Sequence, residues 1–139
     1  MREASTALEP RVLAAGQATA DMVLQAEGYV FATPENLAAM SGELKSFFDR
    51  TYYAVLDRIL SRPYGMLICA GSDGSNAARQ IERIATGWRL KLVAPPLIVC
   101  TQAQSPEAIA RQKQICASDL ERCRELGATL AGGLELGIF

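Results

Sequence analysis

The stretch TPENLAAMSGELKSFFDR, residues 33–50, decides the fold. It follows the short apolar run GYVFA, residues 28–32, which is typical of a buried strand. It opens as a Pro-containing turn and ends in a segment with helical periodicity. The stretch therefore predicts a strand that leads through a loop into a helix, and the loop itself needs an explanation.

The helix expected after this loop runs from about Ser41 to Leu60. Its apolar positions recur every three or four residues: Leu44, Phe47, Phe48, Tyr52, Val55, Leu56, Ile59 and Leu60. Ser41 can cap the helix, and Glu43 lies in its first turn. Because Phe47 and Phe48 belong to the apolar stripe and lie beyond the loop, we expect them to serve packing rather than ligand binding.

Strands and helices alternate on both sides of this unit. The patterns predict strands at 27–32, 64–71 and 90–100, and helices at 21–26, 75–88 and 118–134, with 101–117 irregular or partly helical. Pro95-Pro96 predicts a bend in the last strand, and Ser118 followed by Glu121 predicts a capping box. Such apolar strands separated by amphipathic helices predict an α/β fold, a parallel sheet with helices on both faces.

The composition bounds the function. The chain has 139 residues, which suits one domain at 1–139, and a formal net charge of −1. Nucleic acid and membrane are therefore poor candidate partners, and the lack of a signal-peptide core favours the cytoplasm. There is no histidine, which removes imidazole catalysis. The four cysteines fit no zinc module, so no metal site is expected, and Cys69 and Cys100 are expected to be buried.

Ligands of parallel sheets bind at the carboxyl ends of strands, where two loops qualify. One is the quoted stretch, and the other is AGSDGSN, residues 70–76. Gly71 and Gly74 allow positive φ and a close approach of a ligand to the backbone. The alternative is an ordinary strand-to-helix turn with Asp73 or Ser75 as N-cap. No Gly-Lys-Ser/Thr is present, so a nucleotide P-loop is excluded.

The quoted stretch resembles the flavodoxin-like NAD(P)H-dependent FMN reductase and quinone reductase family. That family has Thr-Pro, a few variable positions, Met-Ser-Gly, a Lys, and Asp-Arg after its third strand. The matching residues are Thr33, Pro34, Met40, Ser41, Gly42, Lys45, Asp49 and Arg50. The resemblance covers residues 26–90, and RPYGMLICAGSDGSN falls where the family has its fourth strand and next flavin loop.

The resemblance implies a flavodoxin-like fold, FMN and NAD(P)H as cofactors, and hydride transfer to a quinone or similar small-molecule acceptor. It also implies which residues contact the flavin ring. On one side these are Thr33, Pro34, Glu35, Asn36, Leu37 and Met40, and on the other Ala70, Gly71, Ser72, Asp73 and Gly74. It implies no catalytic side chain, because the cofactor carries the hydride chemistry.

Two departures from the family lead to further expectations. Asn36 stands where many members have an aromatic residue, so ring stacking is lost there. The family also begins with a strand and a Ser/Thr/Gly-rich phosphate loop, and neither is found in this sequence. Residues 1–10 resemble the end of the family's first helix, and residues 11–20 a weak second strand. We therefore expect an N-terminally truncated fold that binds FMN weakly or not at all.

A missing first strand would leave the strand at 28–33 with an unpaired side in the family's strand order, 2-1-3-4-5. An exposed apolar edge is a template for pairing, so either residues 11–15 pair with it or another chain does. We expect a homo-oligomer. The competing hypothesis is a non-catalytic flavodoxin-like remnant that acts in protein association, and a flavodoxin-type electron carrier is a third possibility.

Overall fold

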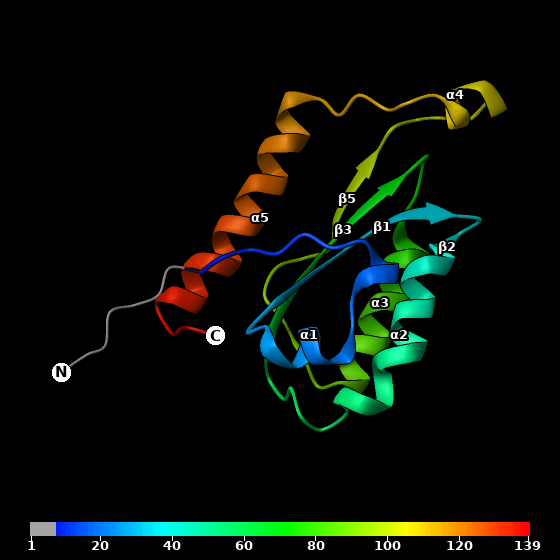
Figure 1. The fold of residues 1–139 in the computed structure, drawn as a ribbon. Coiled ribbons are helices and arrows are strands. Elements are labelled where there is room, and N and C mark those ends of the chain that lie inside the picture. The colour runs from blue at the N-terminus through cyan, green and yellow to red at the C-terminus, as the bar shows by residue number, and fades with distance from the viewer. Residues whose placement is uncertain (1–7) are drawn as a thin grey trace.

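The computed structural model describes residues 8–139. The elements follow in the order η1 (Ala15–Gln17), α1 (Ala20–Gln25), β1 (Tyr29–Asn36), β2 (Ala39–Met40), α2 (Gly42–Val55), β3 (Pro63–Ala70), α3 (Ser75–Gly87), β4 (Lys91–Leu92), β5 (Leu97–Cys100), α4 (Pro106–Ala110) and α5 (Ala117–Glu135). Figure 1 shows the sheet between α5 on one side and α1, α2 and α3 on the other. The predicted α/β sheet with helices on both faces is confirmed.

The sheet has the strand order β2-β1-β3-β4, with β5 also paired to β3. β1 and β3 run parallel over six residue pairs, from Tyr29↔Tyr64 to Pro34↔Cys69. β4 and β5 pair with the two ends of β3, so they form one strand position that the bend at Pro95-Pro96 interrupts, as predicted. β2 pairs antiparallel with the end of β1, so the sheet is mixed rather than wholly parallel.

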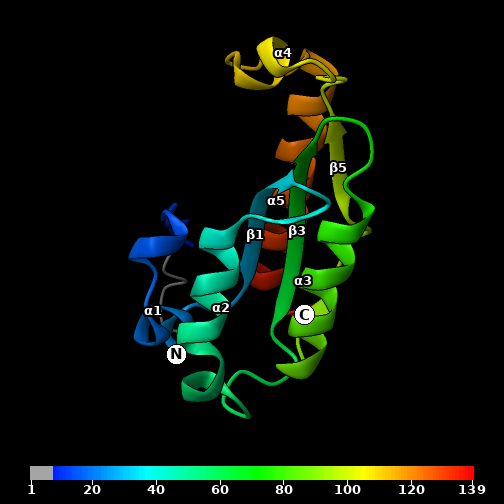
Figure 2. The same cartoon turned by 90° about the vertical axis from the view of Figure 1, so that its right-hand side faces the viewer.

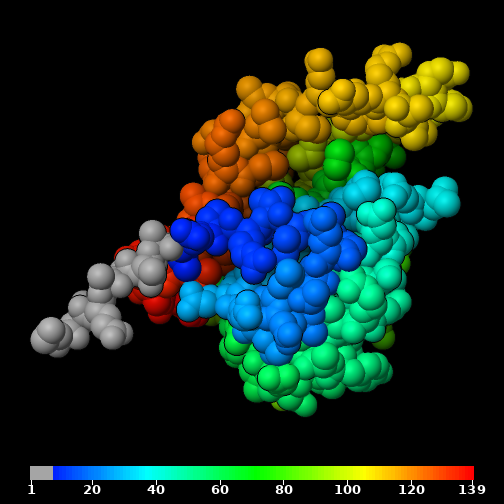
Figure 3. All heavy atoms as spheres, viewed as in Figure 1, coloured from blue at the N-terminus to red at the C-terminus, as the bar shows by residue number. Residues whose placement is uncertain are grey.

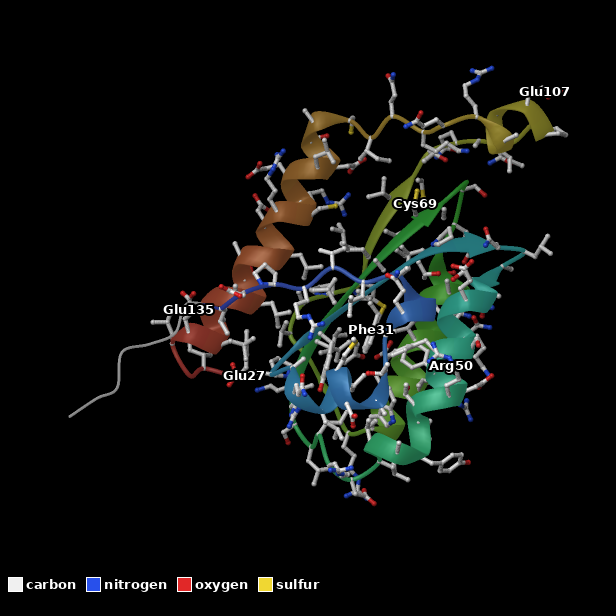
Figure 4. The ribbon with its side chains drawn as sticks, viewed as in Figure 1. Glu27, Phe31, Arg50, Cys69, Glu107 and Glu135 are labelled. Atoms are coloured by element: carbon white, nitrogen blue, oxygen red, sulfur yellow. The ribbon has the colours of Figure 1, made fainter. Side chains whose placement is uncertain are left out.

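The main core lies between the sheet and the helices α2 and α3. Phe31 of β1 contacts Phe48 of α2 at a ring-centroid distance of 5.2 Å, and Phe48 contacts Trp88 at 5.5 Å. The Trp88 side chain is fully buried, and its Nε1 donates a hydrogen bond to the Tyr52 carbonyl at 3.0 Å. Figure 4 shows Phe31 inside this layer. The predicted packing role of Phe47 and Phe48 is confirmed, because both are buried.

The two faces of β1 are covered unequally, although the sequence predicted burial on both. Tyr29, Phe31 and Thr33 are buried toward α2 and α3, whereas Val30 and Ala32 on the opposite face are exposed. α5 packs on that face, but over β3 and β5 rather than β1. The view in Figure 2, turned by 90°, shows α5 behind the strands and α2 and α3 in front. Cys69 is likewise only half-buried and Cys100 is exposed, so their expected burial was wrong.

Two helix ends differ from their predicted positions. α2 begins as predicted, with the Ser41 hydroxyl accepting from the Leu44 N–H at 3.2 Å, but it ends at Val55 rather than Leu60. The residue after its C-cap, Asp57, has a left-handed φ of 64°, which stops the helix. α5 is capped by Cys116, one residue before α5 begins at Ala117. The predicted Ser118–Glu121 capping box is absent, because Ser118 lies inside the helix rather than at its N-cap, and Glu121 pairs with Arg124 at 3.2 Å.

The N-terminal segment forms no strand within the described residues. Residues 8–14 lie outside any helix or strand, residues 15–17 form η1, and only the predicted helix at 21–26 is confirmed, as α1. The predicted helix end at 1–10 lies mostly outside the described residues. Arg50 of α2 holds η1 in place by donating to the Ala15 and Ala18 carbonyls at 2.9 and 3.1 Å. Figure 3 shows η1 and α1, in blue, on the front surface between α5 and α2.

Candidate functional site

The two loops singled out in the sequence lie side by side at the carboxyl ends of β1 and β3. Because the parallel pairing continues to Pro34↔Cys69, the loop residues that follow each strand emerge at the same edge of the sheet. The chain after β5 reaches the same edge, and Figure 1 shows the segment with α4 projecting beyond it. This edge is where α/β sheets bind ligands.

The first of these loops is a β-hairpin rather than an open loop. β1 continues through Thr33–Asn36, Leu37 and Ala38 form the turn, and Ala39–Met40 return as β2. Leu37 and Ala38 have φ of 50° and 60°, which matches the left-handed two-residue turns of hairpins. The Thr33 hydroxyl accepts from the Ser41 N–H at 2.9 Å and so closes the base of the hairpin.

The second loop, residues 70–74, is a tight strand-to-helix connection. Gly74 is the N-cap of α3 with φ of 85°, a conformation that glycine adopts without strain, so neither Asp73 nor Ser75 is the cap. Gly71 has no positive φ; instead, a Cβ there would lie 3.0 Å from the Ala103 carbonyl oxygen. The close approach that Gly71 permits is therefore to another loop of the same chain.

The residues that follow β5 form a third wall of the site. The Thr101 and Gln102 N–H groups donate to the Ala70 and Gly71 carbonyls at 2.9 and 2.7 Å. No sequence pattern indicates this contact, because residues 101–117 show neither a clear periodicity nor a motif. The segment fixes the backbone of residues 70–71 and leaves residues 72 and 73 exposed.

The predicted flavin-contacting residues fall into three groups by exposure. Thr33, Met40, Ala70 and Gly74 are buried; Glu35 and Gly71 are half-buried; Pro34, Asn36, Leu37, Ser72 and Asp73 are exposed. In the first group, the Met40 and Ala70 side chains pack in the main core, and the Met40 and Gly74 N–H groups already donate to Gln80 and Glu35. The third group lies open on the surface.

Four backbone donors stand out at this edge. Within residues 8–139, the N–H groups of Leu37, Ala38, Ser72 and Asp73 donate no hydrogen bond, and all four residues are exposed. Two come from the hairpin tip and two from the loop before α3. Unpaired donors of this kind fit the polar edge of a flavin ring, which carries oxygen and nitrogen acceptors. The same loop holds a negative charge, because hydrogen bonds from the hydroxyl and backbone N–H of Ser75 lower the pKa of Asp73.

Two cavities accompany the fold, and they lie at different places. A cavity of 370 Å³ adjoins the hairpin and lies between the sheet and α5; its lining is almost wholly apolar and includes Thr33, Pro34, Leu67, Val99 and Leu120. A larger cavity of 650 Å³ is lined by Arg62, Leu134 and Phe139 among others, near the amino ends of β1 and β3. The smaller cavity belongs to the candidate site, because two of its lining residues, Thr33 and Pro34, are part of the predicted flavin loop.

Residues 8–139 contain no cluster of three or more Cys, Asp or Glu side chains that could hold a metal ion. None of the helices in this part of the chain is long and apolar enough to cross a membrane.

A known protein family matches most of this chain. The model of the family described as NADPH-dependent FMN reductase matches residues 6–117. No curated protein matches the sequence.

Solved structures resemble the fold at low sequence identity. A flavodoxin from the domain Archaea aligns with a TM-score of 0.67 and 17% identity, covering 86% of this chain and 73% of that chain. An oxidoreductase from Corynebacterium diphtheriae aligns with a TM-score of 0.58 and 21% identity, and the alignment covers 81% of this chain and 58% of that chain. A flavodoxin, WrbA-like protein from Agrobacterium tumefaciens aligns with a TM-score of 0.56 and 18% identity, and the alignment covers 81% of this chain and 68% of that chain. These likenesses show that the fold is flavodoxin-like.

Proposed function

Because the chain belongs to the NADPH-dependent FMN reductase family, we propose that it is a flavin-dependent NAD(P)H oxidoreductase. Its acceptor is a quinone or a similar small molecule. The observation that carries this proposal is the set of four exposed, unpaired N–H groups on Leu37, Ala38, Ser72 and Asp73. When bound, FMN supplies the hydride chemistry.

The protein's own part in this function is to bind and orient the ring. The hairpin at 33–40 and the loop at 70–74 provide backbone donors for the polar edge of the flavin. The cavity of 370 Å³ beside Thr33 and Pro34 is lined by apolar groups and has no charged side chain in its lining. It can therefore bind the apolar part of a ligand. No side chain is assigned to acid or base catalysis.

We also propose that this chain binds FMN weakly. Phosphates often bind at helix N-termini, where each charge-assisted hydrogen bond contributes about 1.5–3 kcal/mol. The N-terminus of α3 adjoins both loops, but the Glu35 carboxylate already accepts from Gly74 and Ala77 there. The ring then supplies most of the affinity and the phosphate little.

A comparison of FMN with riboflavin tests this proposal, because the two ligands differ only in the phosphate. We expect quenching titrations of the purified protein to give dissociation constants that agree within about threefold, a difference under about 0.7 kcal/mol. Stoichiometric FMN after purification, or FMN bound about 100-fold more tightly than riboflavin, would contradict weak phosphate binding. Oxidation of NADH and NADPH with a naphthoquinone as acceptor then tests the reaction itself.

A second function is favoured by one specific observation. Within residues 8–139, no strand pairs with Tyr29–Thr33 on the edge of β1 that faces away from β3. An open strand edge suits a non-catalytic flavodoxin-like protein that acts in association, including association with its own copies. The absence of binding for both FMN and riboflavin would favour this alternative.

A further inference from the structure

One carboxylate joins the two loops of the candidate site. Glu35 Oε1 accepts a hydrogen bond from the Gly74 N–H at 2.9 Å, and Oε2 accepts from the Ala77 N–H at 3.3 Å. Glu35 belongs to the hairpin, whereas Gly74 and Ala77 belong to the N-terminus of α3. A negative charge is favourable at this end of a helix, because the N–H groups there give it a partial positive charge.

Two further side chains of α3 contact the same hairpin. Asn76 Nδ2 donates to the Ala38 carbonyl, and Gln80 Oε1 accepts from the Met40 N–H at 2.9 Å. Asn76 and Gln80 are four residues apart and therefore lie on one face of the helix. We call these four hydrogen bonds, made by the side chains of Glu35, Asn76 and Gln80, the hairpin clamp.

The hairpin tip requires such support. Leu37 and Ala38 both occupy the left-handed region, which the Cβ atom makes unfavourable. The Leu37 side chain is fully exposed, so its own packing does not hold the turn in this conformation. The contacts that hold the tip come from α3, more than 30 residues further along the chain.

We propose that Glu35 is a positioning residue for flavin binding, and this proposal rests on the proposed function. Its carboxylate fixes the hairpin against the N-terminus of α3, so that the N–H groups of both loops can contact one ring. The side chain itself does not touch the flavin, since both of its oxygen atoms are occupied by the protein. The family resemblance of the quoted stretch instead implied that Glu35 contacts the ring.

The test compares Glu35→Gln and Glu35→Ala with the unchanged protein. Gln keeps one acceptor oxygen but presents an NH2 group to the second N–H, and Ala removes both acceptors. We expect riboflavin and FMN affinity to fall about threefold for Gln and about tenfold or more for Ala, losses of about 0.7 and 1.4 kcal/mol. The absorption spectrum and reduction potential of the flavin that still binds should shift, because donors to its polar edge are displaced.

A matched control is Glu43→Gln. Glu43 is exposed in the first turn of α2, so the same charge is removed near a helix N-terminus without touching the hairpin. Its flavin affinity and spectrum should be unchanged. A Glu35→Ala protein with lower thermal stability but the original flavin spectrum, potential and affinity would overturn the proposal and leave Glu35 a purely structural residue.

A measurement without flavin separates this proposal from the proposed function. In the ligand-free protein, Glu35→Ala should speed the hydrogen exchange of the Gly74 and Ala77 amides, and of the Met40 amide bound by Gln80. Unchanged exchange at these amides would refute the clamp whether or not the protein binds flavin. Faster exchange in a protein that binds no flavin would keep the clamp, refute its role in flavin binding and refute the proposed function with it.

Discussion

Phe47 shows how a single side chain of the quoted stretch contributes to the fold. It is 5% exposed and contacts Phe48 and Trp88 at ring-centroid distances of 5.2 and 6.4 Å. Replacing it with Ala removes these contacts and leaves a cavity, so Phe47→Ala should lower the free energy of unfolding by about 3–5 kcal/mol. Urea denaturation measures the loss. Tyr53→Ala is the control, because Tyr53 is 83% exposed on the same helix.

The control should change the free energy of unfolding by less than about 0.5 kcal/mol. Flavin affinity should not change in either variant as long as the protein is folded. If Phe47→Ala left stability unchanged and weakened ligand binding, the assignment of Phe47 to the core would be wrong.

Tyr64 makes stability depend on pH at the alkaline end. Its side chain is 2% exposed, and burial, with the negative charge of Glu82, raises its pKa from 10.0 to about 12. The unfolded chain therefore releases this proton at a lower pH than the folded protein, so stability present below about pH 10 is lost as the pH rises toward about 12. Tyr64→Phe should flatten the fall of the urea midpoint over this range.

Two other tyrosines serve as comparisons for the pH dependence expected from Tyr64. Tyr29 also has a raised pKa, through burial that a hydrogen bond from Arg62 partly offsets, so some slope should remain in the Tyr64→Phe variant. Tyr53→Phe, at an exposed position, should keep the full slope. Equal slopes in the Tyr64→Phe variant and the unchanged protein would show that the Tyr64 phenol does not contribute.

At the scale of elements, the hairpin β1–β2 carries a conformational cost that sequence changes can relieve. Its turn residues, Leu37 and Ala38, both have positive φ, and Asn-Gly is the dipeptide preferred at such turns. The double substitution Leu37→Asn, Ala38→Gly should therefore raise the free energy of unfolding by about 1–3 kcal/mol. Chemical denaturation measures the gain.

A glycine placed where φ is negative provides the comparison. Ala128→Gly, on the exposed side of α5, should cost about 0.5–1 kcal/mol, because glycine loses more freedom in a helix than alanine does. If the Asn-Gly hairpin variant were destabilised as well, the left-handed turn would not be the conformation of the protein in solution.

At the scale of the whole molecule, the open edge of β1 leads us to propose a homo-oligomer. Within residues 8–139, Tyr29–Thr33 has a strand partner on one side only, and an open edge of this kind is a template for pairing with another chain. Val30 is 41% exposed beside that edge, so apolar area is also open to a second copy. Light scattering should show a dimer or larger species rather than the 15.0 kDa chain.

A charge on the open strand tests where the copies meet. Ala32→Lys places a lysine on an exposed position of β1, and natural edge strands use lysine to prevent pairing. This variant should shift the protein toward the monomer, while Leu136→Lys, at an exposed position after α5, should not. A folded monomer of the unchanged protein at all concentrations would rule out the homo-oligomer.

The sequence by itself determined the elements whose information is local. The apolar spacing from Leu44 to Val55 and the Ser41 hydroxyl were sufficient for α2 and its cap, and the Pro95-Pro96 pair for the break between β4 and β5. The family and the flavodoxin-like fold followed from the quoted stretch, because its turn, the helix cap and the first turns of the helix are encoded within 18 consecutive residues.

Only the tertiary structure decided the contacts between distant segments. β1 extends to Asn36 because β3 pairs with it as far as Pro34 and β2 pairs with Glu35 and Asn36, and the sequence pattern indicated neither pairing. Glu35 reaches Gly74 across 39 positions of the chain, and its apparent place in a ligand loop hid its role as a partner of α3. Residues 11–20, expected to form a weak strand, form none, because pairing depends on a neighbour in space as well as on strand propensity.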